Sequence, residues 1–328
     1  MSAYPWFASL WQSLMTRHAR WPHALLLVGP RGIGKRDFAL ALAAARLCET
    51  PLADGHACGK CSACHWLGQG SHPDFRLLEP YVGEAGEEEE GVRRKREISI
   101  AQVRALSDFV GLSSVRAGER VIMIHPAEAM NTAAANALLK TLEEPHPQVR
   151  LILVSHQAHA LLPTIKSRCQ RIAMPPATTV QARAWLQEAG VKEIELSMAL
   201  AGGAPLLAKD FAQPTYLEAR RTFLNSLLYP ASLNWIALAE QNAREDLVAR
   251  FDWLQTWIYD LSCQRLTGRL RYNLDFVDGL QELAARVNLT RVFHFARELA
   301  QIKRRLQHPL NPQLLLESVL LNYLAAVN

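Results

Sequence analysis

The chain has 328 residues, of which 49% are hydrophobic and 20% are charged, and its net charge is +5. These proportions suit a globular protein of about two or three domains. The mild positive charge fits acidic or nucleic-acid-associated partners without requiring them. No stretch approaches the roughly 20 apolar residues of a membrane span, and no secretion signal opens the sequence. We therefore expect a cytoplasmic protein with no membrane contact.

Short unbroken apolar runs mark the first half of the chain, at residues 24–28, 121–124 and 151–154, with a weaker run at 75–78. Continuous apolar sequence is typical of strands buried on both faces, as in a parallel sheet covered by helices. Helical patterns lie between these runs, at residues 37–47, 100–112 and 133–144. The first half therefore predicts an α/β domain over residues 1–172.

A phosphate-binding motif without its metal ligand follows the first apolar run. Residues 29–36 read GPRGIGKR and match G-x-x-x-x-G-K-[ST] through Lys35. In a working P-loop the glycines, here Gly29 and Gly34, let backbone N–H groups cradle phosphates, the lysine reaches the phosphates, and a Ser or Thr hydroxyl holds Mg²⁺. Arg36 stands at that last position and has no acceptor oxygen. Nucleotide binding at Gly29, Gly34 and Lys35 stays open, whereas hydrolysis is not expected.

The second metal ligand of a P-loop ATPase is also missing. A hydrolysing enzyme of this kind carries an acidic residue directly after a buried strand. Here His125 and Pro126 follow the run at 121–124, and Glu128 comes too late. We expect no ATPase activity from the isolated chain.

A cluster of cysteines follows the helix predicted after the phosphate loop, and its members are Cys48, Cys58, Cys61 and Cys64. Their spacing allows the thiolates to converge on a tetrahedral Zn²⁺. Such a set would leave no open coordination position, so the site would be structural. His56 and His65 are alternatives to one of the sulfurs, and free thiols are a third interpretation. The cluster indicates a metal module at 48–64 in a reducing compartment and not a disulfide framework.

The second half of the chain is helical throughout. We predict a small helical domain over residues 173–210 and an all-helical domain over residues 211–328. In the latter, one apolar stripe follows the helical period, through Leu247, Phe251, Leu254, Ile258 and Leu261. Asn311 is the expected N-cap of the last helix, with Pro312 at its first position.

Residues 81–97 form an insertion of low hydrophobicity, with four glutamates followed by a basic quartet. Opposite charges that nearly cancel favour a solvated loop over a nucleic-acid-binding segment.

Two further segments are particular in sequence. Residues 135–145 read ANALLKTLEEP, and Ser167-Arg168-Cys169 follows the apolar run at 151–154. Together with the cysteine module, the degenerate phosphate loop, the opening Tyr4-Pro5-Trp6 and NPQLLLE at 311–317, they make the chain resemble the delta-prime subunits of bacterial DNA polymerase III clamp loaders. The resemblance covers nearly the whole chain.

The resemblance implies an AAA+ module, in which the α/β P-loop domain (1–172) carries the zinc module and is followed by a helical lid (173–210). A helical collar (211–328) completes the chain. It also implies a hetero-pentamer with gamma/tau and delta subunits, part of a DNA polymerase holoenzyme, which opens the beta clamp and places it on primer-template DNA. Delta-prime is the non-hydrolysing member of such a complex.

The resemblance further assigns roles to single residues. Arg168 would be the arginine finger that enters the ATP site of an adjacent gamma/tau subunit. Zinc would be held by Cys48, Cys58, Cys61 and Cys64. The lid arginine that senses nucleotide in active members is absent from residues 203–206.

Two other functions are weighed against this one. An active gamma-like ATPase would need the metal ligands that Arg36 and His125 replace. A zinc-ribbon nucleic-acid-binding protein with a vestigial P-loop would need a basic stripe with interleaved aromatic residues, and the sequence shows none. Both therefore rank below the non-hydrolysing subunit.

Overall fold

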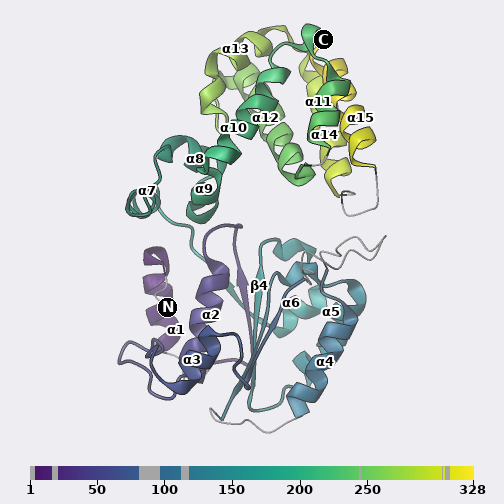
Figure 1. Ribbon diagram of the computed structural model, residues 1–328. Helices are drawn as coiled ribbons and strands as arrows, with labels where there is room; N and C mark the ends of the chain where they lie inside the picture. The colour runs from purple at the N-terminus through teal and green to yellow at the C-terminus, as the bar shows by residue number, and fades with distance from the viewer. Residues whose placement is uncertain are drawn as a thin grey trace. The chain divides into compact units, whose positions relative to one another are not determined.

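The computed structural model describes residues 4–16, 21–80, 97–111, 118–243, 245–304, 306 and 311–328. The chain divides into two compact units, Met1–Gln181 and Ala182–Asn328 (Figure 1). The charged insertion expected as a loop lies outside the described residues, apart from Glu97. The finer division into 1–172, 173–210 and 211–328 stays a prediction. Of the helices in the described part of the chain, none has the length and apolar character needed to cross a membrane.

The first unit is built on a parallel sheet, which has five strands in the described residues. The strands are β1 (Ala24–Val28), β2 (Phe75–Leu78), β3 (Arg120–Ile124), β4 (Val149–Ser155) and β5 (Gln170–Ala173). They lie in the order β2-β3-β4-β1-β5, and every neighbouring pair is parallel. Strands β1 and β3 are buried along their whole length, as their unbroken apolar sequences predicted. The expected α/β fold with a parallel sheet is confirmed.

The apolar pattern did not predict β5. This strand pairs with β1 alone and lies at the edge of the sheet, and of its residues only Ile172 is buried. An edge strand with one buried side chain has no continuous apolar run to reveal it.

Helices cover both faces of the sheet. They are α1 (Ala8–Met15), α2 (Lys35–Leu47), α3 (Ser62–Gly68), α4 (Ile100–Gly111), α5 (Thr132–Glu143) and α6 (Pro163–Arg168). Figure 1 shows α1, α2 and α3 on one side and α4, α5 and α6 on the other. Asn131 begins α5 by accepting a hydrogen bond from the Ala134 amide (2.9 Å), and Pro145 follows its end. The three helices predicted between the strands are confirmed to within two residues of their ends.

Because the strands are parallel, the loops that follow them gather at one edge of the sheet. The phosphate loop after β1, Glu79 after β2 and His125 after β3 all lie at this carboxyl edge. The last turns of α5 and α6 lead into β4 and β5 and therefore lie at the opposite, amino edge. This separation decides which residues can act together.

The second unit is helical, as predicted. Its helices are α7 (Thr179–Glu188), which begins just before the division, α8 (Ile194–Leu200), α9 (Pro205–Phe211), α10 (Pro214–Leu227), α11 (Trp235–Asn242), α12 (Leu247–Thr267), α13 (Val277–Arg286), α14 (Leu289–Arg304) and α15 (Pro312–Val327). The predicted apolar stripe lies on α12. Its members Phe251, Leu254, Ile258 and Leu261 are buried, and Leu247 is partly buried. Asn311 caps α15 through the amides of Gln313 and Leu314, as expected.

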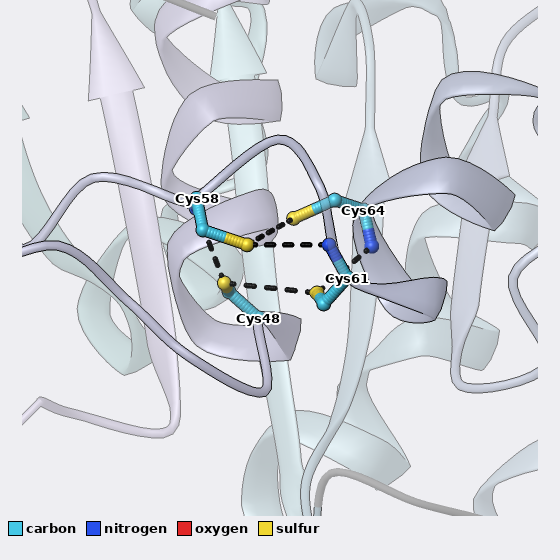
Figure 2. A group of neighbouring side chains, drawn as sticks. All are labelled: Cys48, Cys58, Cys61 and Cys64. Atoms are coloured by element: carbon cyan, nitrogen blue, oxygen red, sulfur yellow. Dashed lines mark hydrogen bonds between the residues drawn. The ribbon is translucent and has the colours of Figure 1, made fainter.

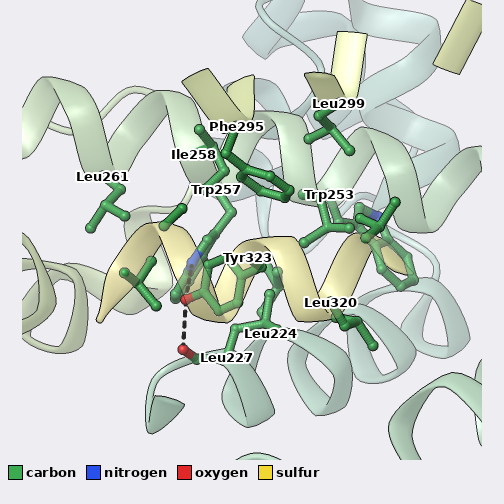
Figure 3. Close-up of a cluster of buried hydrophobic side chains, with 14 of the residues drawn as sticks. Leu224, Leu227, Trp253, Trp257, Ile258, Leu261, Phe295, Leu299, Leu320 and Tyr323 are labelled. Carbon is green, nitrogen blue, oxygen red and sulfur yellow. Dashed lines mark hydrogen bonds between the residues drawn. The ribbon is translucent and has the colours of Figure 1, made fainter. Parts of the chain in front are cut away.

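Aromatic side chains with satisfied polar groups fill the core of this helical unit. The Trp257 indole donates a hydrogen bond to the Tyr323 hydroxyl (3.2 Å), which in turn donates to the Leu227 carbonyl (2.7 Å) (Figure 3). These contacts join α12, α15 and α10. Buried tryptophan and tyrosine need such partners for their polar ends.

A buried carboxylate organises the loop between α12 and α13. Asp260 is fully buried and accepts hydrogen bonds from the backbone amides of residues 271–273 and from the Asn273 side chain. Arg220, also fully buried, donates to Asn273 and pairs with Asp275 (2.8 Å). The network ties this loop to α10 and α12.

Candidate functional site

The phosphate loop joins β1 to α2 and keeps the backbone shape of its motif. Gly34 has φ 93° and is the N-cap residue of α2, and Gly32 has φ 76°. Residues with a side chain rarely adopt this left-handed conformation. The first turn of α2 therefore presents its backbone N–H groups as a phosphate-binding loop does.

The lysine of the motif is turned onto its own loop. The Lys35 side chain is buried, and its ammonium donates hydrogen bonds to the carbonyl oxygens of Gly29 (2.7 Å) and Pro30 (2.5 Å). Burial lowers the pKa of Lys35 to about 8, although the charge of Glu128 opposes that shift. The group that reaches nucleotide phosphates in a working P-loop is thus occupied by the loop itself.

An ion-pair bridge joins the two positions that would supply Mg²⁺ ligands. Arg36 Nε donates to Glu79 Oε1 (2.7 Å) and Arg36 Nη2 to Glu79 Oε2 (3.2 Å). His125 Nδ1 lies 2.8 Å from Glu79 Oε1. The hydrogen bonds from His125 and Arg36 lower the pKa of Glu79 to about 2. The Glu79 carboxylate is therefore held between a guanidinium and a histidine.

The sequence patterns did not reveal Glu79, because the acid of a P-loop ATPase was expected only after the run at 121–124. The available signal was its place directly after the weaker run at 75–78, since parallel neighbouring strands end at the same edge. Glu128 comes too late in the chain to stand at the position of that acid. The charge of Glu128 nevertheless acts on Lys35, and its carboxylate accepts a hydrogen bond from the His156 amide (2.8 Å).

The opening aromatic residues cover the phosphate loop. The Tyr4 hydroxyl donates to the carboxylate of Asp37 in the first turn of α2 (2.5 Å). The Tyr4 ring stacks on Trp6 with 4.9 Å between centroids, and the Trp6 indole donates to the Ile33 carbonyl (2.8 Å). A Cβ placed on Gly34 would collide with the Tyr4 ring. Tyr4 thus lies directly on the glycine of the phosphate cradle.

The cysteine side chains converge on one point (Figure 2). The Sγ atoms of Cys48 and Cys61 lie 3.9 Å apart, as do those of Cys58 and Cys64, and all four lie within 4.8 Å of one another. A tetrahedral metal with metal–sulfur bonds of about 2.3 Å separates its sulfur ligands by about 3.8 Å. The cluster can therefore hold a metal ion with little rearrangement.

The surroundings of the cysteines also bear on metal binding. Hydrogen bonds from the Thr50 side chain and from the amides of Lys60 and Cys61 lower the pKa of Cys58 to about 6. Burial raises the pKa of Cys64 to about 12. A divalent cation among the sulfurs would favour the thiolate form of each.

The two histidines considered as alternative ligands have other contacts. The His56 ring stacks on Trp11 with 4.1 Å between centroids, and a ring nitrogen of His65 lies 3.1 Å from the Gln69 amide. Among the described residues, the group able to hold a metal consists of the four cysteines.

Arg168 lies apart from the phosphate loop. It is the last residue of α6, directly before β5, and so lies at the amino edge of the sheet. Its Nη1 donates to the Thr164 carbonyl (3.1 Å) and the Ser167 hydroxyl (3.3 Å), and its Nη2 pairs with Glu143 Oε1 (2.8 Å). The five residues of β1 span roughly 16 Å between the two edges. Arg168 and Lys35 therefore do not form one site.

The sequence matches known proteins along most of its length. A family model described as "DNA polymerase III, delta subunit" matches residues 7–178, and one described as "DNA polymerase III, delta subunit, C terminal" matches residues 214–324. DNA polymerase III subunit delta' of Pseudomonas aeruginosa is 40% identical over 80% of this chain and 78% of its own length. The subunit of the same name in Escherichia coli K12 is 30% identical over 98% of this chain and 95% of its own. The chain belongs to the DNA polymerase III delta-prime family.

This membership confirms the resemblance that the motifs indicated. Among solved structures, a DNA polymerase III gamma subunit-related protein from Thermotoga maritima aligns with 97% of this chain and 99% of its own length, at 20% identity and a TM-score of 0.46. The roles assigned to Arg168, the phosphate loop and the cysteines stay predictions, because family membership does not test single residues.

Proposed function

We propose that this chain is the delta-prime subunit of a bacterial DNA polymerase III clamp loader and does not hydrolyse ATP itself. Relatives that carry this name match nearly its whole length. In the complex it would assemble with gamma/tau and delta subunits in the cytoplasm. Through them it would take part in placing the beta clamp on primer-template DNA.

The arrangement at the carboxyl edge supports the absence of hydrolysis. Arg36 and His125 stand where an ATPase has its metal ligands, and both are bound to Glu79. Tyr4 covers the loop, and Lys35 is engaged by its carbonyl oxygens. An active gamma-like ATPase would require these contacts to be broken and the metal ligands to be restored.

The observation that carries the proposal is the placement of Arg168 at the edge of the sheet opposite to its own phosphate loop. A partly exposed arginine there cannot serve the loop of its own chain, but a site on an adjacent subunit can reach it. Arginine supplied in trans stabilises the charge that develops on the transferred phosphoryl group. We assign this role to Arg168, acting on ATP bound by a neighbouring gamma/tau subunit.

The cysteine cluster is assigned to structural zinc. Soft thiolate ligands at this spacing select Zn²⁺, and a complete set of them leaves no position for a substrate. The metal would fix the loop between α2 and α3 and would take no part in phosphoryl transfer.

Reconstitution with the gamma/tau and delta subunits tests the function. An Arg168→Ala variant should assemble normally and lower the ATPase rate of the complex, because removing an arginine finger lowers kcat by about 10³–10⁵ at the site it serves. Arg171→Ala, at an exposed position on β5, removes the same charge nearby and should leave the rate unchanged. Equal rates for the two variants would contradict the assigned role.

A further inference from the structure

We propose that Glu143 is a positioning residue for Arg168. Its carboxylate holds the guanidinium in the orientation in which an ATP site on the adjacent subunit would meet it. This inference rests on the proposed function, because it concerns how the finger is held. It assigns a role to the first glutamate of the TLEEP sequence at 141–145.

Two helix ends bring the pair together. Glu143 is the last residue of α5 and Arg168 the last residue of α6, and these helices pack against each other. Both ends lie at the amino edge of the sheet, just before β4 and β5. The two residues are far apart in sequence, so only the packing of α5 on α6 makes them neighbours.

The guanidinium is held from two sides. Nη1 is fixed by the helix that carries Arg168, through the Thr164 carbonyl (3.1 Å) and the Ser167 hydroxyl (3.3 Å). Nη2 is fixed by the neighbouring helix, through Glu143 Oε1 (2.8 Å). Without Glu143 the remaining contacts come from one helix turn, and the plane of the guanidinium can rotate about the side chain.

The held guanidinium can still bind a phosphate. A guanidinium carries more N–H donors than these contacts use. The Arg168 side chain is 35% exposed and that of Glu143 is 48% exposed, so a neighbouring molecule can reach the pair. A long flexible arginine that is ordered in advance loses less freedom when it meets the transition state. Donors fixed before the reaction also need no reorganisation during it.

The ion pair between Glu143 and Arg168 contributes little to the stability of the fold. Ion pairs at this exposure add little to the free energy of unfolding because water screens them. Loss of the carboxylate should therefore change turnover and leave the fold intact, which makes the role testable by substitution.

The test uses the complex reconstituted with gamma/tau and delta subunits, with ATP as substrate. Glu143→Ala should lower kcat by about two- to fivefold, the factor that corresponds to loss of an exposed ion pair, with KM for ATP unchanged. Glu143→Gln, which keeps an acceptor oxygen, should lie between this variant and the wild type. Glu144→Ala, at the exposed neighbouring position, is the matched control and should retain full kcat.

The decisive measurement is the same substitution in the Arg168→Ala background. If Glu143 acts through Arg168, Glu143→Ala should cause no further loss there. An equal loss in both backgrounds would show a separate structural effect and overturn the inference. So would an unchanged or raised kcat for Glu143→Ala alongside a lowered kcat for Arg168→Ala. An unchanged kcat for Arg168→Ala would instead refute the finger role, and with it the inference that depends on it.

Discussion

Removal of the Tyr4 ring should open the phosphate loop to nucleotide. The Tyr4 ring lies against Gly34, and we expect ATP to have to displace it before its phosphates can reach the loop. Opening breaks the hydrogen bond from the Tyr4 hydroxyl to Asp37 and the stacking on Trp6. Tyr4→Ala removes both contacts in advance, so the variant should bind ATP more tightly than the wild type.

The size of the effect follows from the contacts broken. A hydrogen bond to a charged acceptor contributes about 1.5–3 kcal/mol, and we take the lower half of that range because Tyr4 is only half-buried. Stacking on Trp6 adds about 0.5–1.5 kcal/mol. A total of about 2–4 kcal/mol corresponds to a gain in apparent affinity of about 30- to 700-fold. Tyr4→Phe keeps the stacking and loses the hydrogen bond, so it should gain only about 10- to 40-fold.

Calorimetric titration of the isolated chain with ATP measures this gain. The gain should be the same with and without Mg²⁺, because Arg36 and His125 supply no metal ligand. Tyr229→Ala, at an exposed position in the second unit, is the control for loss of a tyrosine. Equal ATP affinities for the wild type, Tyr4→Phe and Tyr4→Ala would refute the reasoning that the ring closes the loop.

Three further predictions concern the metal, the carboxyl edge and the helical unit. Metal analysis of the pure protein should give about one zinc per chain. The Cys58→Ser variant should lose the zinc, whereas Cys263→Ser, outside the cluster, should keep it. A folded, metal-free wild type would exclude the zinc site. Glu79→Gln should lower the free energy of unfolding by about 1 kcal/mol at neutral pH, allowing for solvent screening. The folded-state pKa of Glu79 is depressed from 4.5 to about 2, so the difference in free energy of unfolding between this variant and the wild type should shrink as the pH falls through that window. Urea titrations measure this difference, and a growing difference would contradict the prediction. Asp260→Ala should destabilise the second unit by about 3–5 kcal/mol, because it leaves buried hydrogen-bond donors without an acceptor. Denaturant titrations followed by tryptophan fluorescence measure this loss. Asp210→Ala, at an exposed position, should have little effect.

Local sequence was sufficient for much of the fold. The apolar runs that became β1, β3 and β4 carry their burial in consecutive residues, and the helix beginning at Asn311 carries its cap and its proline side by side. The cysteine cluster could be predicted for the same reason, because three of its members lie within a few residues of one another. Short-range patterns of this kind are properties of the chain before it folds.

The contacts on which the proposed roles rest depend on strand order and on helix packing, which the order of residues along the chain does not reveal. The sequence by itself determined that the phosphate loop lacks its metal ligands and that Arg168 belongs to a recognisable motif. Only the tertiary structure showed that Glu79 joins Arg36 to His125, that Tyr4 lies on Gly34, and that Glu143 holds Arg168. The physical reason is that these residues lie tens of positions apart in sequence. Pairing of β2 with β3 brings Glu79 to His125, packing of the N-terminal segment on α2 brings Tyr4 to Gly34, and packing of α5 on α6 brings Glu143 to Arg168.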